Sequence, residues 1–336
     1  MTVRMDFEPA SVTVVIPTHD RCDLLSEAVD SVLGQTGVRS KVLVVDDGSQ
    51  DGTPAWLRAQ RDARVRHLRL EPARERTAAR NAGLAEVTTP YVLFLDDDDV
   101  LAPRALQRLA RALDRHRSAP VAAGTYATFG VYGPNELPRE PTIGRVAVTR
   151  RMWREILWGW YLLPGAGLWR ADYLRGIGGW DEGRSFAEDL ELSLRIHPRP
   201  MALVPHVVLR YRQWGRTVDD ATEAAHERMN EEVREAFVAA LPPAERRVGR
   251  KVIDTRPVFQ RALAAYGAGD YRTARAGLTE GLRAVPALLG SPVLGPMFLE
   301  MLGKSTIALA APMSVRLRVR DARHKRRAER LGPKAA

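Results

Sequence analysis

The first hundred residues alternate short apolar runs with stretches of helical periodicity. Val12–Ile16, Lys41–Val45 and Tyr91–Leu95 are short and apolar, and the first two are rich in β-branched residues, so they predict buried strands. Apolar residues recur at helical spacing between the first two runs, over Leu24–Leu33. Strands that are apolar on both faces and alternate with helices predict an α/β fold with a mostly parallel sheet flanked by helices.

Polar clusters follow three of the predicted strands. They begin at Pro17 and Thr18, at Asp46 and Asp47, and at the run of four aspartates from Asp96 to Asp99. The carboxyl ends of parallel strands lie at one edge of a sheet, and ligands of open α/β sheets bind beyond that edge. We therefore expect the three clusters to converge on one site.

The second half of the chain changes character twice. Gly and Pro are frequent over 124–143, which predicts loops around short strands, and 201–211 predicts one more strand. Helical patterns dominate after Asp220. We expect an α/β domain over 1–220, a helical extension over 221–312 and a basic tail over 313–336.

The extension contains a predicted helical hairpin, Val258–Tyr266 and Tyr271–Val285, that looks like a single tetratricopeptide-type unit. One such unit cannot bury its own apolar face. It is expected to pack on the α/β domain or on another subunit of a homo-oligomer. A repeat that docks a different protein is the alternative.

The positive charge is concentrated in the tail. The chain has 51 Lys and Arg against 41 Asp and Glu, a net charge of +10, and residues 313–336 hold nine of the basic residues and two of the acidic ones. The nearly neutral remainder argues against a nucleic-acid-binding protein. The tail either lies on an anionic membrane or is a solvated terminus.

The cysteine content and the apolar runs bear on the compartment. Cys22 is the single cysteine, which excludes an intrachain disulfide. The start of the chain lacks a signal-peptide pattern, and no apolar run approaches the ~20 residues of a membrane-spanning helix. These features predict a cytoplasmic protein, at the inner face of the membrane if the tail binds lipid.

The four consecutive aspartates, Asp96–Asp99, predict a metal site. Adjacent carboxylates repel each other and raise each other's pKa, and a divalent cation relieves that repulsion. Hard oxygen ligands suit Mg²⁺ or Mn²⁺. A cation held by one or two carboxylates keeps open coordination positions for phosphate oxygens. The alternative is a solvated acidic turn that caps the helix beginning near Pro103.

Two further clusters have a structural and a functional interpretation each. Asp46 and Asp47 either accept hydrogen bonds from a ribose or base, or form an Asx turn and a helix cap. Arg76 and Arg80 either bind phosphate near a helix N-terminus or form a solvated basic face.

Glu188 and Asp189 precede an apolar helix, and this pair of carboxylates also has two interpretations. A carboxylate at that place either caps the helix or serves as a general base. Glycine-rich nicotinamide and P-loop signatures, zinc-ligand spacing and the serine-hydrolase elbow are all missing from the sequence.

Five motifs in a fixed order resemble family 2 glycosyltransferases of the GT-A fold, whose sheet is Rossmann-like. They are the segments Val12–Thr18, Val44–Thr53, Arg80–Gly83, Phe94–Asp99 and Gly178–Leu192. Each motif is weakly specific alone, and the resemblance covers about residues 10 to 215. It implies an inverting transferase that moves a sugar from a nucleotide-diphosphate sugar to a hydroxyl of a glycan, a glycolipid or a natural product.

The resemblance also implies roles for individual residues. Asp189 is the expected general base, with Glu188 supporting it or holding the acceptor, and Asp96 and Asp98 are the expected ligands of Mn²⁺ or Mg²⁺. The remaining donor contacts implied by the resemblance are Pro17, Thr18 and Asp20 around the nucleotide, Asp46 or Asp47 at the base or ribose, Asp97 in the acidic motif, and Arg76 and Arg80 as the basic contact.

One departure from the family pattern and two alternatives remain. Many relatives have a histidine after a Tyr-Arg pair, whereas this chain reads Tyr211, Arg212, Gln213, Trp214, so a histidine metal ligand is not expected there. A nucleotidyltransferase would also use a parallel sheet, but it favours a Gly-rich first loop that this chain lacks. A non-catalytic scaffold predicts loss of the acidic residues, yet Asp98 and Asp189 are present.

Overall fold

A computed structural model describes residues 9–130, 137–138, 147–160, 162–214, 219–291 and 294–310 of the 336-residue chain. The described strands form one sheet, with the order β3-β2-β1-β4-β9-β6-β10-β5 and with β7 and β8 paired beside this path. The bounds of the strands are β1 Ser11–Thr18, β2 Arg39–Asp46, β3 Val65–Arg69, β4 Tyr91–Phe94, β5 Val100–Leu101, β6 Val121–Gly130, β7 Leu137–Pro138, β8 Ala147–Thr149, β9 Gly167–Arg170 and β10 Met201–Gln213.

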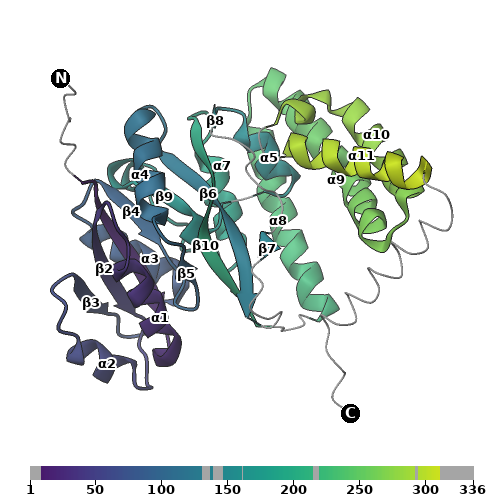
Figure 1. Ribbon diagram of the computed structural model, residues 1–336. Coiled ribbons are helices and arrows are strands. Elements are labelled where there is room, and N and C mark those ends of the chain that lie inside the picture. The colour runs from purple at the N-terminus through teal and green to yellow at the C-terminus, as the bar shows by residue number, and fades with distance from the viewer. Residues whose placement is uncertain are drawn as a thin grey trace, which may run out of the picture.

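Helices flank this sheet and continue beyond it. Their bounds are α1 Cys22–Leu33, α2 Thr53–Ala59, α3 Glu75–Glu86, α4 Ala105–Arg115, α5 Met152–Trp158, α6 Ala171–Gly176, α7 Glu188–Arg195, α8 Asp220–Ala240, α9 Pro243–Ala268, α10 Tyr271–Ala284 and α11 Leu294–Ala310, with 3₁₀ turns η1 Pro164–Ala166 and η2 Pro286–Gly290. Figure 1 shows β1, β2 and β3 on one side of the molecule and α9, α10 and α11 on the other, with α5 and α8 between them.

The N-terminal part of the sheet is parallel, as the sequence predicts. Strand β1 lies between β2 and β4, so that Val15 is paired with Leu43 on one side and Phe94 on the other. All three of these side chains are buried. The parallel direction brings the ends of β1, β2 and β4 to the same edge, which is where the polar clusters begin.

The second part of the sheet is mixed rather than parallel. Strand β9 enters between β4 and β6 and is antiparallel to both, whereas β6 and β10 are parallel to each other. Whether a strand runs parallel or antiparallel to its neighbour depends on the edge of the sheet at which the preceding connection brings the chain back. A strand as short as β9, with four residues, carries no local signal of that direction.

Strand β6 corrects one sequence-based expectation. Its ten residues form one continuous strand, although loops around short strands were predicted from Gly124 onward. Gly124 lies against Val208 of β10, and a Cβ atom at this position would come within 2.5 Å of the Val208 side chain. Close packing against a neighbouring strand therefore outweighs the low strand propensity of glycine. Residues 131–136 and 139–143 of the predicted loop region lie outside the described residues.

The helical hairpin is present as α9 and α10, and α9 is much longer than predicted. It begins at Pro243 and passes through Pro257 without ending. The Arg256 side chain on α9 donates from Nε to the carbonyl oxygen of Trp158 on α5 at 3.1 Å. The hairpin therefore packs on the part of the chain that carries the sheet, which is one of the two arrangements expected.

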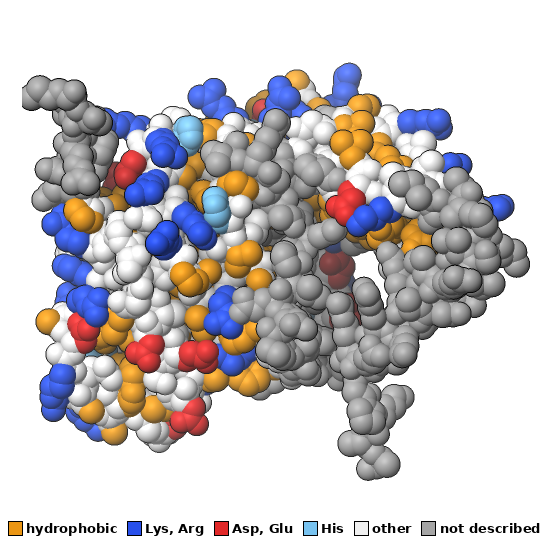
Figure 2. Space-filling model, in the orientation of Figure 1, with side chains coloured by type: hydrophobic (Ala, Val, Ile, Leu, Met, Phe, Trp, Pro, Cys, Tyr) orange, Lys and Arg blue, Asp and Glu red, His pale blue; other side chains and the backbone are white. Residues whose placement is uncertain are grey.

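No helix in the described part of the chain is long and apolar enough to cross a membrane. The basic tail from residue 313 lies outside the described residues, and its contact with an anionic membrane stays a prediction. On the face seen in Figure 2, described Lys and Arg side chains are scattered among hydrophobic and polar ones.

Candidate active site

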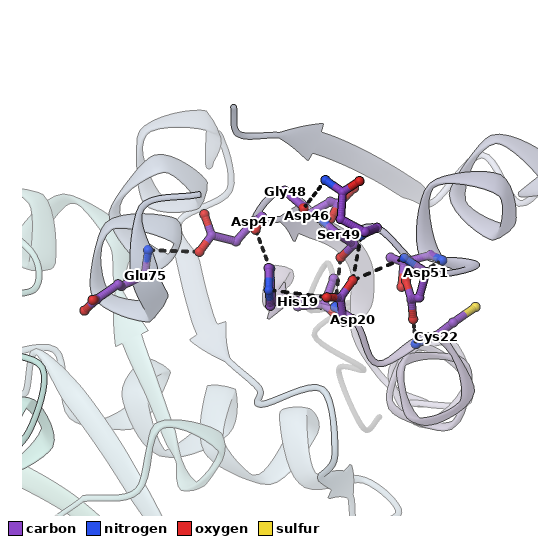
Figure 3. Close-up of polar contacts among 12 residues, drawn as sticks. His19, Asp20, Cys22, Asp46, Asp47, Gly48, Ser49, Asp51 and Glu75 are labelled. Carbon is purple, nitrogen blue, oxygen red and sulfur yellow. Dashed lines mark hydrogen bonds and ion pairs between the residues drawn. The ribbon is translucent and has the colours of Figure 1, made fainter. Parts of the chain in front are cut away.

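The loops after β1 and β2 are held together by side-chain contacts to backbone amides. Asp20 has a left-handed backbone with a φ of 52°, and its Oδ1 accepts from the backbone N–H of Gln50 at 2.6 Å and of Asp51 at 3.2 Å. The backbone N–H of Asp20 donates in turn to Oγ of Ser49 at 3.0 Å. Figure 3 shows Asp20 and Ser49 between the two loops. Asp20 thus fixes the loops, and it does not border the cavities described below.

The two aspartates that end β2 make the contacts of a turn and a helix cap. Oδ1 of Asp46 accepts from the backbone N–H of Ser49 at 2.9 Å, and its Oδ2 pairs with Arg69. Asp47 accepts from the N–H groups of Arg74 at 2.7 Å and Glu75 at 2.9 Å, which begin α3. Both carboxylates therefore have structural partners, and a role in binding base or ribose stays a prediction.

A cavity of about 390 Å³ lies at the ends of β1 and β4. The sequence-predicted residues around it are Pro17, Thr18, Asp47, Arg76, Asp96, Asp97 and Asp98. The structure adds residues to which the sequence motifs gave no definite role in the site, namely His19, Arg21, Ala79, Tyr211, Arg212 and Trp214. The two loops and the acidic run converge as expected, because the parallel strands deliver them to one edge.

The acidic run contains two buried side chains and two that are partly exposed. Asp99 is buried and accepts from the backbone N–H of Arg212 at 2.8 Å. Asp97 is also buried, and it accepts from the hydroxyl of Thr18 at 2.8 Å and from Arg21 at 3.2 Å. Asp96 and Asp98 are more exposed, with 31% and 17% of their side chains accessible.

Burial and charge shift the pKa values within this run in opposite directions. Burial raises the pKa of Asp97 to about 6, against the effects of Thr18 and Arg21. Burial also raises the pKa of Asp99, with Asp96 adding to it. Burial acts in the same sense on Asp96, but the charge of Arg80 and its hydrogen bond outweigh it and lower the pKa of Asp96. Asp96 is therefore the member held ionised by a direct partner.

A second cavity of about 200 Å³ adjoins the first and shares Arg76, Asp96 and Tyr211 with it. Its other lining residues are Arg80, Asp99, Leu163, Pro164, Phe186, Ala187, Glu188, Asp189, Leu190 and Asn230. The predicted general base and the predicted metal ligands are thus in adjoining cavities. Asp96, one of the predicted metal ligands, borders both cavities.

Asp189 lies in the first turn of α7 and faces the smaller cavity. The residue before the helix, Ala187, has a φ of 61°, so the chain turns sharply into α7. Within the described residues Oδ1 of Asp189 has no hydrogen-bond partner, and its nearest cation is Arg80 Nη1 at 3.7 Å. Burial raises the pKa of Asp189 to about 7, against the lowering effect of Arg80.

Arg76 and Arg80 are one helical turn apart but differ in environment. The Arg76 side chain is 51% exposed, borders both cavities and pairs with Glu188 at 2.7 Å. Arg80 is 1% exposed, and its guanidinium contacts Asp96, Glu188 and Asp189. Arg76 is therefore available to a ligand, whereas Arg80 is occupied by carboxylates of the chain.

The fit to a divalent cation depends on Asp96 and Asp98. In the described part of the chain, no group of three His, Cys, Asp or Glu side chains is arranged to hold a metal ion. The contacts of the two aspartates use Oδ1 of Asp96 and Oδ2 of Asp98, which receives Arg21 and the indole N–H of Trp214. Mg²⁺ is commonly held by one or two carboxylates together with substrate phosphates. The other carboxylate oxygen of each of these two aspartates fits such a site, and the phosphate oxygens of a diphosphate would complete the coordination.

Several lining residues gave little or no signal in the sequence. Tyr211 and Arg212 lie at the end of β10 and Trp214 follows it, and the three were noted only as part of a departure from the family pattern. Asn230 lies on α8, beyond the range of the motifs, and borders the smaller cavity. A single asparagine on a polar helix carries no pattern, so only the packing of α8 beside α7 could reveal it.

The sheet, with carboxylates and cavities at the carboxyl ends of its strands, defines the class of α/β proteins that bind ligands at that edge. Residues 13–172 match the family model described as glycosyl transferase family 2. This segment therefore belongs to that family, and the resemblance seen in the motifs is confirmed.

Comparisons with individual proteins agree with this assignment. The chain is 30% identical over 255 residues to validoxylamine A glucosyltransferase of Streptomyces hygroscopicus subsp. jinggangensis, covering 66% of this chain and 57% of that one. It is 39% identical over 103 residues to the succinoglycan biosynthesis protein ExoO of Rhizobium meliloti, covering 31% and 30%. The chain thus spans only part of these relatives.

A solved structure shows the same fold. The S. aureus protein TarS, residues 1–349, in complex with UDP-GlcNAc superposes with a TM-score of 0.61 at 17% identity, covering 88% of each chain. The predicted GT-A fold with a helical C-terminal region is therefore confirmed.

Proposed function

We propose that this protein transfers a sugar from a nucleotide-diphosphate sugar to a hydroxyl acceptor, with inversion at the anomeric carbon. The observation that carries this proposal is the pair of adjoining cavities. The larger has the loops after β1 and β2 and the acidic run, the smaller has Asp189, and the two meet at Arg76, Asp96 and Tyr211. A transfer reaction needs such a junction between a donor site and an acceptor site.

The donor would occupy the larger cavity. Its nucleotide would lie near Pro17, Thr18 and Asp47, with the diphosphate toward Arg76 and the acidic run. Asp96 and Asp98 would hold Mg²⁺ or Mn²⁺, and a cation bound there would neutralise charge that develops on the diphosphate. The half-exposed guanidinium of Arg76 would contact the same phosphate oxygens.

The acceptor would occupy the smaller cavity with one hydroxyl beside Asp189. Asp189 takes the proton of this hydroxyl as its oxygen forms a bond to the anomeric carbon. The bond between that carbon and the diphosphate oxygen breaks, and its electron pair leaves with the nucleoside diphosphate. Attack from the face opposite the leaving group inverts the anomeric carbon. The desolvated carboxylate, with a pKa raised to about 7, suits a base that works near neutral pH.

The named relatives support the reaction class. One is a glucosyltransferase, and the TarS structure was solved with a UDP-sugar. Leu163, Phe186 and Tyr211 give the smaller cavity an apolar wall, which suits the carbon face of a sugar acceptor. We also propose residues 1–220 as the catalytic unit and 221–312 as an extension that borders it through Asn230.

A variant at Asp189 tests the proposal. UDP-glucose and UDP-GlcNAc are first screened with Mn²⁺ for release of UDP by the wild-type protein. Asp189→Asn is expected to lower the transfer rate by about 10²–10⁴-fold, because the amide cannot accept the proton. UDP binding by the variant, measured by calorimetry, should stay close to the wild-type value. Unchanged turnover would reject the base, and a product with retained anomeric configuration would reject inversion.

A further inference from the structure

The guanidinium of Arg80 is almost completely enclosed by protein. Arg80 lies on α3, its side chain is 1% exposed, and it is among the largest fully buried side chains of the molecule. Burial disfavours the charged form, but the charges of Asp96 and Asp189 outweigh it and raise the pKa of Arg80. The structure therefore keeps a permanent positive charge in the wall of the smaller cavity, next to Asp96.

This charge joins two parts of the candidate site that are far apart in sequence. Nη2 of Arg80 donates to Oδ1 of Asp96 at 2.6 Å. Nη1 lies 3.5 Å from Oε1 of Glu188 and 3.7 Å from Oδ1 of Asp189. Asp96 follows β4 and borders both cavities, and the other two begin α7 and border the smaller one, so one planar group links the carboxylates of the two elements.

An aromatic side chain and a turn fix the position of this group. The guanidinium carbon of Arg80 lies 4.4 Å from the ring centroid of Trp180, whose ring meets Phe94 of β4 edge to face at 5.5 Å. The Asn81 side chain, next to Arg80 on α3, exchanges hydrogen bonds of 2.8 and 2.9 Å with the backbone of Trp180. Arg80 therefore has a packed surface on one side and carboxylates on the other.

Direct binding of phosphate by Arg80 fits these contacts poorly, because both terminal nitrogens already face carboxylates. Arg76 is 51% exposed and borders both cavities, so it is the better candidate for the donor. The two arginines, equivalent in the sequence, have separate tasks in the fold.

We infer that Arg80 is a positioning residue that holds the carboxylate of Asp189 in a fixed place relative to Asp96. The inference rests on the proposed function, because it assigns Asp189 to the acceptor and Asp96 to the donor. The planar guanidinium directs Nη2 at Asp96 and Nη1 at Asp189, whereas a lysine ammonium has one nitrogen and lacks this rigid fork. Loss of this link should move the base away from the reacting hydroxyl without removing any donor contact.

Arg80→Lys tests this inference, since it keeps the charge and loses the second contact. The kcat for UDP release from the donor that wild type uses is expected to fall about 10- to 100-fold, as for a misplaced catalytic group. The Kd for UDP, measured by calorimetry in the presence of Mn²⁺, should change by less than about threefold. Arg76→Lys is the matched comparison, and it should weaken UDP binding more than Arg80→Lys does.

Arg195→Lys controls for a general loss of structure. Its guanidinium donates to the carbonyl oxygens of Ile177 and Gly179 in the turn before Trp180 and does not border either cavity. It should lower the Tm with little change in kcat.

Two outcomes would overturn the positioning role. One is a wild-type kcat in Arg80→Lys. The other is an Arg80→Lys protein in which kcat and UDP affinity fall by the same factor and Tm falls as much as in Arg195→Lys. A wild-type protein that neither binds UDP nor releases it from a sugar donor would instead reject the proposed function.

Discussion

At the scale of single residues, the same residue type has different tasks according to its partners. All four consecutive aspartates border one or both cavities, but Asp97 and Asp99 are buried, whereas Asp96 and Asp98 are partly exposed. The sequence predicted an acidic site here but could not separate these roles. Neighbouring side chains in a turn point in different directions, and that geometry has no compositional signal.

The pH dependence of transfer should report the ionisation of Asp189. A general base acts in its ionised form, and burial raises the pKa of Asp189 to about 7. Its ionised fraction therefore falls as the pH drops through 7, and kcat/KM should decrease about tenfold per pH unit below that value. A profile of kcat/KM from pH 5 to 8.5 checks this. A rate that stays flat down to pH 5 would exclude Asp189 as the titrating base.

A second residue-scale prediction concerns Asp98. If Asp98 holds the cation, Asp98→Ala should weaken the binding of UDP in the presence of Mn²⁺ and have little effect in its absence. Calorimetry with and without Mn²⁺ measures both values. Asp114→Ala is a suitable control, because Asp114 accepts from the hydroxyl of Tyr91 away from the cavities. Equal Mn²⁺ enhancement in wild type and Asp98→Ala would contradict the ligand role.

At the scale of elements, the position of α3 decides where Arg76 and Arg80 lie. This helix packs on β1 and β2 at Gly83, where a Cβ atom would come within 2.4 Å of Val15 and 3.1 Å of Val45. The motif that contains Gly83 was recognisable in the sequence. Its physical reason, close approach of a helix to β-branched side chains, is visible only in the packing.

Gly83→Ala should therefore destabilise the protein, by about 1–3 kcal/mol, because stiff valine side chains cannot move aside without strain. Chemical denaturation measures the free energy of unfolding. Gly267→Ala on α9 is the matched control, since nothing lies within 4 Å of a Cβ there. It should stabilise the protein by up to about 1 kcal/mol through helix propensity. Equal effects of the two substitutions would contradict the close packing of α3.

At the scale of the whole molecule, the helical extension is joined to the sheet-bearing part through α5. Trp158 of α5 meets Phe259 of α9 and Phe298 of α11 edge to face at 6.1 and 5.3 Å. Glu155 of α5 accepts from the hydroxyl of Ser291, which precedes α11. Both Glu155 and Ser291 are buried, so the contact belongs to the interior of the molecule.

Glu155 makes the stability of this contact dependent on pH. Burial raises the pKa of Glu155 from 4.5 to about 7, so the folded protein holds a proton there that the unfolded chain releases. Its stabilising contribution is full below pH 4.5 and is lost as the pH rises through 7, which amounts to about 3 kcal/mol. Glu155→Gln should lose less stability than wild type between pH 5 and 8.

Denaturation curves at pH 5, 6, 7 and 8 measure this difference. Glu223→Gln, at an exposed position on α8, is the control and should follow the wild-type dependence. If Glu155→Gln and wild type lose the same free energy of unfolding between pH 5 and 8, Glu155 does not hold the extra proton.

The sequence by itself determined the parallel strands β1, β2 and β4, the acidic and basic residues that follow them, and the helical character after Asp220. These features follow from local periodicity and from residue type, both of which are apparent in short segments of the sequence. Tertiary structure alone decided that β9 enters the sheet antiparallel, that Arg80 is buried against Asp189, and that Asn230 reaches a cavity. Each depends on contacts between residues distant in sequence, where burial and charge pairing, rather than local preference, set the energy.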